Sequence, residues 1–170
     1  MSVPGVQDDR AGQLDPAPTI LVVDDEPAVR RLVRRIIERT GWQFYEADDG
    51  EAALAMVQET DATLDAVLTD LQMPRIGGRA VAEVLVRCRP DIAVVCMTGF
   101  ATDAVVDRWA AAARIPVLNK PFTEEMLIDA LVQRITRSRE RRRRRRAGST
   151  SGERPRDCSD LIAVARRLSA

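Results

Sequence analysis

Between residues 19 and 137 the sequence alternates, five times over, short apolar runs with stretches whose apolar residues recur at helical spacing. The runs predict strands at 19–23, 43–47, 64–69, 92–97 and 115–118, and the stretches predict helices at 27–40, 52–58, 78–89, 104–113 and 124–137. Parallel strands need crossover connections and bury both of their faces under helices. We therefore expect an α/β fold, in which a five-stranded parallel sheet carries helices on both faces.

Length and composition allow one domain with flanking segments. The chain has 170 residues, 45% of them hydrophobic, which is enough for a single core. We expect that core in a domain at 19–137. Residues 1–18 contain several prolines and glycines, and lack both the basic start and the apolar stretch of a signal peptide, so they predict a disordered leader. Residues 138–170 predict an arginine-rich flexible tail with a short helix at 159–168 that frays by itself.

The net charge of zero conceals an asymmetry along the chain. Residues 1–136 hold 14 basic and 22 acidic side chains, whereas residues 137–170 hold 12 basic and 4 acidic side chains. The first part is therefore acidic and the tail strongly basic. Attraction between the two parts, or a polyanionic partner for the tail, is the physical expectation.

The number and spacing of the cysteines indicate the cellular compartment in which the protein works. Cys88, Cys96 and Cys158 are odd in number and widely spaced, which favours reduced thiols over disulfides or a zinc site. Together with the missing signal peptide and the absence of a membrane-spanning stretch, this predicts a cytoplasmic protein.

Residues suited to phosphate chemistry follow four of the expected strands: Asp24 and Asp25, Asp70, Thr98, and Lys120. Ligands of parallel sheets bind beyond the carboxyl ends of the strands. Carboxylates gathered there repel one another, and a Mg²⁺ ion with its preference for oxygen ligands would offset that repulsion.

Each of these residues except Asp70 also has an ordinary structural explanation; Asp70 ends an expected buried strand and no helix start follows it directly. Asp24 and Asp25 precede Pro27, so they suit the cap of a helix that starts there. Thr98 suits a turn, and Lys120 suits a solvated loop, although it is the only lysine among 26 basic residues. The residue types alone leave both explanations open.

Taken together, the motifs Asp24-Asp25, Leu68-Thr69-Asp70-Leu71-Gln72-Met73-Pro74, Met97-Thr98-Gly99 and Asn119-Lys120-Pro121-Phe122 carry a specific resemblance. In order and spacing, the chain resembles the receiver domain of two-component response regulators, of the single-domain type, over about residues 18 to 137. The resemblance implies a flavodoxin-like fold of the receiver type.

The resemblance also implies a role for each site residue. Asp70 would accept a phosphoryl group from a phosphohistidine on a sensor histidine kinase or phosphotransfer protein. Asp25, Asp70 and the backbone carbonyl of Gln72 would ligate Mg²⁺ or Mn²⁺, with Asp24 contacting the ion through water. Thr98 and Lys120 would hold the phosphoryl oxygens, and the Lys120-Pro121 peptide is often cis in this family.

By the same resemblance the protein is not an enzyme, apart from magnesium-dependent phosphorylation and dephosphorylation of itself. It would signal to a downstream protein by changing conformation. One position departs from the family pattern: Val117, three residues before Lys120, stands where receivers usually carry a switch aromatic. A valine cannot report the phosphorylated state as a tyrosine would.

Two alternatives concern the output. The run Arg141–Arg146 is either a solvated helical extension or a nonspecific contact for nucleic-acid phosphates, and no helix-turn-helix or zinc spacing accompanies it. In the first alternative the protein is a DNA-associated regulator in which the receiver gates the arginine-rich tail. In the second the receiver fold is a docking scaffold that acts independently of phosphorylation. The chain contains no histidine, so any phosphohistidine donor is a separate molecule.

Overall fold

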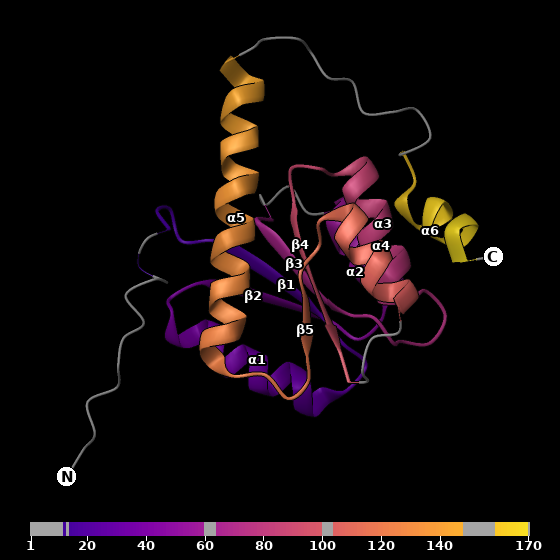
Figure 1. The fold of residues 1–170 in the computed structure, drawn as a ribbon, viewed down its shortest axis with the longest axis horizontal. Coiled ribbons are helices and arrows are strands. Elements are labelled where there is room, and N and C mark those ends of the chain that lie inside the picture. The colour runs from indigo at the N-terminus through magenta and orange to yellow at the C-terminus, as the bar shows by residue number, and fades with distance from the viewer. Residues whose placement is uncertain (1–11, 13, 60–63, 100–103, 148–158, 170) are drawn as a thin grey trace.

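The computed structural model describes residues 12, 14–59, 64–99, 104–147 and 159–169 (Figure 1). Most of the expected leader at 1–18 lies outside the described residues, as does Cys158.

Strands and helices alternate along the described chain as the sequence predicts. The strands are β1 (Thr19–Val23), β2 (Gln43–Ala47), β3 (Ala66–Asp70), β4 (Ala93–Thr98) and β5 (Val117–Asn119). The helices are α1 (Pro27–Arg39), α2 (Gly50–Glu59), α3 (Gly78–Cys88), α4 (Ala104–Ala113), α5 (Glu124–Ala147) and α6 (Leu161–Ser169).

All strands pair in parallel, in the order β2-β1-β3-β4-β5. Because successive side chains of a strand point to opposite faces, Ile20 and Val22 of β1 lie in one apolar cluster while Leu21 and Val23 lie in another. The first cluster includes side chains of α1 and α5, and the second includes side chains of α2 and α3 (Figure 1). The expected five-stranded parallel sheet with helices on both faces is confirmed.

Helix α5 is longer than the sequence pattern predicts. We expected it to end near Arg137, yet it continues to Ala147 (Figure 1). The Ser138 hydroxyl donates to the Asp91 carbonyl at 2.6 Å, and Arg139 Nε lies 3.1 Å from Asp65 Oδ1. Arg142 donates to the Leu64 carbonyl at 2.9 Å. These contacts with the amino-terminal edge of the sheet stabilise the extension. The ion pair between Arg139 and Asp65 is an attraction of the expected kind between the basic tail and the acidic domain.

Helix α6 packs against α2 and α3 instead of fraying in solvent (Figure 1). Leu161, Val164 and Ala165 are buried in the same cluster as α2 and α3. Gln58 of α2 accepts a hydrogen bond from the backbone N–H of Leu161 at 3.3 Å. A short helix that is marginal in isolation is stabilised here by burying its apolar side.

The expectation of reduced thiols is wrong for Cys88, which is disulfide-bonded. Cys96 is a free, buried thiol. Disulfide pairing depends on which distant segments the fold brings to the end of α3, and the spacing of cysteines in the sequence does not show that.

Among the helices of the described residues, none combines the length and the apolar character that crossing a bilayer requires.

Candidate functional site

The first, third and fifth strands bring two carboxylates and one ammonium group together at the carboxyl edge of the sheet. Asp24 directly follows β1 and is fully buried, and Asp70 is the last residue of β3 and is 4% exposed. Lys120, directly after β5, donates to Asp24 Oδ2 at 2.8 Å and to Asp70 Oδ2 at 2.9 Å. The two acids and the lysine are separated by many residues in sequence, and the parallel order of the strands places them at one point.

Asp25 adds an exposed carboxylate to this pair. Asp24, Asp25 and Asp70 each offer a carboxylate oxygen, and these oxygens lie within 4.8 Å of one another. Three carboxylates at that spacing form a hard oxygen donor set of the kind that divalent cations such as Mg²⁺ prefer.

Burial and charge set the protonation of the site. Burial raises the pKa of Asp24, as does the neighbouring Asp70 carboxylate, while hydrogen bonds from Lys120 and from the backbone of Glu26 lower it in part. Burial alone would lower the pKa of Lys120, but its hydrogen bonds to both carboxylates outweigh burial and raise it. Lys120 is therefore a cation at neutral pH.

Thr98 and Gln72 border the same edge. Thr98 ends β4, is 4% exposed, and its carbonyl accepts a hydrogen bond from the Lys120 backbone N–H at 2.7 Å. Gln72 lies two residues past Asp70, and its backbone N–H donates to Asp70 Oδ1 at 3.2 Å. The Lys120-Pro121 peptide is cis. Every strand-end residue singled out in the sequence therefore lies along this one edge.

Val117 lies elsewhere in β5. It begins the strand, pairs with Cys96 of β4, and packs in part against the cluster that contains α3. The expected switch position is thus held by a small apolar side chain.

A family model described as the response regulator receiver domain matches residues 20–132 of this chain. The chain belongs to this family. It is a receiver domain of a two-component response regulator, as the resemblance of its motifs indicates.

Known relatives agree with this assignment. The receiver is 30% identical over 112 residues to the response regulator receiver protein CpdR of Brucella abortus. The aligned residues cover 66% of this chain and 92% of that protein. It is 33% identical over 119 residues to the sensor kinase CckA of the same organism, covering 70% of this chain but only 13% of the kinase. The crystal structure of a receiver domain from Clostridium thermocellum superimposes with a TM-score of 0.64 at 26% identity, covering 72% of this chain and 98% of that one.

Two features that position the receiver's site were missed in the sequence. At Gly78 an added Cβ would lie 1.7 Å from the Asp70 carbonyl oxygen, so only glycine lets α3 start this close to Asp70. Asp49 accepts a hydrogen bond from the Ala52 backbone at 2.7 Å and pairs with Arg75, which joins the loop after Asp70 to the start of α2. The pair Gly77-Gly78 was visible in the sequence, but the close approach of two backbones was not.

Proposed function

We propose that this receiver accepts a phosphoryl group on Asp70 from a phosphohistidine of a sensor histidine kinase or phosphotransfer protein. The observation that carries the proposal is the ammonium group of Lys120, hydrogen-bonded to Asp24 and Asp70 at once beside a third carboxylate. In the transfer, an Asp70 oxygen forms a bond to phosphorus while the bond from phosphorus to the donor's imidazole nitrogen breaks. The imidazole leaves with the electron pair and takes up a proton.

The charge arrangement suits this step. An anionic carboxylate and an anionic phosphoryl group repel each other, so the reaction needs cations at the point of approach. Lys120 can shift one of its hydrogen bonds from Asp70 to a phosphoryl oxygen while keeping its bond to Asp24. The buried Asp24 thereby holds the lysine in place.

Asp24, Asp25, Asp70 and the backbone carbonyl of Gln72 are the groups that would hold a Mg²⁺ or Mn²⁺ ion. The spacing of the three carboxylates fits such an ion. When bound, the ion supplies charge neutralisation and alignment for the phosphoryl oxygens.

The phosphorylated receiver would signal through Thr98. The acyl phosphate adds negative charge next to β4, and a threonine hydroxyl can donate a hydrogen bond to it. We propose that this displaces Thr98 and the start of α4 toward the site, and that a downstream protein binds the shifted surface. With Val117 in place of an aromatic, the shift is transmitted through packing against β4 and α3.

The proposal extends to the partners and the location of the protein. A segment similar to this receiver lies within a sensor kinase, which supports a kinase-linked relay. We propose that the protein catalyses no reaction on another substrate and works in the cytoplasm, where kinases have ATP. A disulfide at Cys88 is unusual in that compartment, so its state in cells is best measured by thiol trapping.

Intact mass spectrometry after incubation with acetyl phosphate and Mg²⁺ tests the proposal. We expect one added phosphoryl group on the parent protein and none on Asp70→Asn. Asp107→Asn, which removes an exposed carboxylate on α4, is the matched control and should label like the parent. Labelling of Asp70→Asn to the level of the parent would overturn the assignment, and failure of the parent to label even with a cognate kinase would favour a docking scaffold.

A further inference from the structure

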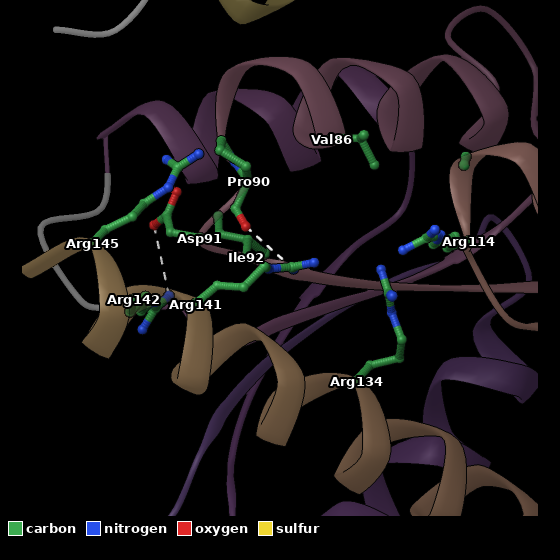
Figure 2. A pocket seen from close by; sticks show the side chains of 10 residues that line it. Val86, Pro90, Asp91, Ile92, Arg114, Arg134, Arg141, Arg142 and Arg145 are labelled. Carbon is green, nitrogen blue, oxygen red and sulfur yellow. Dashed lines mark hydrogen bonds and ion pairs between the residues drawn. The ribbon is translucent and has the colours of Figure 1, made fainter. Parts of the chain in front are cut away.

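A second concave site lies at the opposite, amino-terminal edge of the sheet. It is a cavity of about 170 Å³. Its lining comes from α5, the segment that joins α3 to β4, and the end of α4 (Figure 2). Five arginines line it, Arg114, Arg134, Arg141, Arg142 and Arg145, together with a single acid, Asp91. The lining is therefore strongly positive.

Asp91 does not neutralise this charge. Its carboxylate accepts hydrogen bonds from Arg89 at 3.3 Å and lies 3.6 Å from Arg142. Burial by itself raises the pKa of Asp91, but hydrogen bonds and charge from Arg89 outweigh burial and hold its pKa below the ordinary value. The acid is thus fully ionised and already shared between two arginines.

Arg134 is a buried cation without an ion-pair partner among the described residues. It is 8% exposed, and its Nε donates to the Val94 carbonyl at 3.3 Å. Burial lowers its pKa, and the positive charges of Arg141 and Arg137 lower it further. A charge taken out of water and set among like charges is costly unless an anion accompanies it.

Arg114 and Arg141 converge on the same space. In Figure 2 the side chains of Arg134 and Arg141 extend from α5 towards Arg114, which follows α4. Within the described part of the chain, the Arg141 side chain donates only to the Pro90 carbonyl, at 3.4 Å, and Arg114 forms no ion pair. Three guanidinium groups from two sides of the cavity therefore have donors to spare.

We propose that this cavity binds a small phosphate compound that carries at least two negative charges. Guanidinium forks match phosphate oxygens in geometry and charge. The volume is well below the roughly 300–1,000 Å³ that encloses a drug-sized ligand, so a phosphate or pyrophosphate group fits and any larger remainder of the ligand stays outside. A recessed cavity of this size favours a small phosphate compound over the backbone of a DNA duplex.

Binding there would tie α5 to the ends of α3 and α4. The anion would remove the repulsion between the arginines and stabilise the extended part of α5. Ligands that bind only the folded state raise its stability by mass action. The proposed site therefore adds a small-molecule input that is independent of phosphorylation at Asp70.

Inorganic pyrophosphate is the probe, titrated calorimetrically into the full chain at fixed ionic strength without divalent metal. Under these conditions the three carboxylates at the other edge repel the probe. We expect binding to the parent and a loss of affinity of about tenfold or more in Arg114→Gln/Arg141→Gln. The control Arg143→Gln/Arg144→Gln makes the same charge change at exposed positions of α5 outside the cavity, and should bind within about twofold of the parent.

Three results would overturn the proposal: no pyrophosphate binding by the parent at millimolar concentration, equal weakening in both double variants, or binding of a short DNA duplex without binding of pyrophosphate. Either of the last two results would show that α5 binds anions nonspecifically, as a polycation. If a variant fails to fold, amide shifts of the parent on adding pyrophosphate decide the matter. Shifts centred on the amides of 91–92, 113–114 and 134 support the cavity, and shifts spread evenly along α5 contradict it.

Discussion

At the scale of single residues, the site depends on how closely Gly78 approaches Asp70. A Cβ at Gly78 would overlap the Asp70 carbonyl, so Gly78→Ala must displace the last residue of β3. We expect a loss of about 1–3 kcal/mol in the free energy of unfolding and slower phosphorylation. Urea denaturation measures the first and acetyl phosphate labelling the second. Gly99→Ala, whose Cβ meets nothing within 4 Å, is the control. Parent-like behaviour of Gly78→Ala would show that the site does not depend on this close approach.

Cys96 offers a second prediction for one residue. Burial raises the pKa of its thiol to about 12, with the Asp70 carboxylate adding to the rise and Arg134 opposing it. Since the thiolate is the reactive form, the folded protein should alkylate at Cys96 far more slowly than the urea-unfolded protein at pH 8. Peptide mapping after a timed pulse of iodoacetamide measures both rates. Equal rates in the two states would show that Cys96 is not enclosed.

At the scale of secondary-structure elements, α6 is held by its apolar side. Leu161 is 3% exposed and Leu168, on the same helix, is 41% exposed. Leu161→Ala removes buried methyl groups, a change that lowers the stability of a core by about 2–5 kcal/mol. Here the loss of stability is limited to the free energy with which α6 docks, because the helix can detach while the sheet stays folded. We expect faster hydrogen exchange across 161–169 with little change in β1 or β3.

Leu168→Ala removes the same atoms from an exposed position and should leave the exchange of α6 unchanged. Equal effects of the two substitutions would mean that α6 is not docked through Leu161.

The helices and strands could be predicted from the sequence more completely than the contacts between them could. The runs before Asp24, Asp70, Thr98 and Lys120 are short, apolar and β-branched, so their strands and the edge where they end could be predicted. The length of α5 could not, because Asp65 and Asp91, which hold Arg139 and Arg142, are remote in sequence. The docking of α6 likewise depends on surfaces of α2 and α3 that exist only in the folded sheet.

At the scale of the whole molecule, the two edges of the sheet carry opposite charge. The carboxyl edge gathers Asp24, Asp25 and Asp70 around one lysine, and the amino edge gathers the arginines of α5 and Arg114. The sequence shows this asymmetry along the chain, yet its placement at two ends of one sheet follows only from the parallel topology. A phosphoryl group at one edge and an anion at the other would act on the opposite ends of β4 and β5.

The proposed function rests on Asp70 as the residue that takes the phosphoryl group. Borohydride reduces an aspartyl phosphate to homoserine, so reduction of the phosphorylated protein, proteolysis and tandem mass spectrometry locate the modified residue directly. We expect homoserine at position 70 alone. Homoserine at position 24 or 25, or a phosphorylated protein with none at position 70, would contradict it.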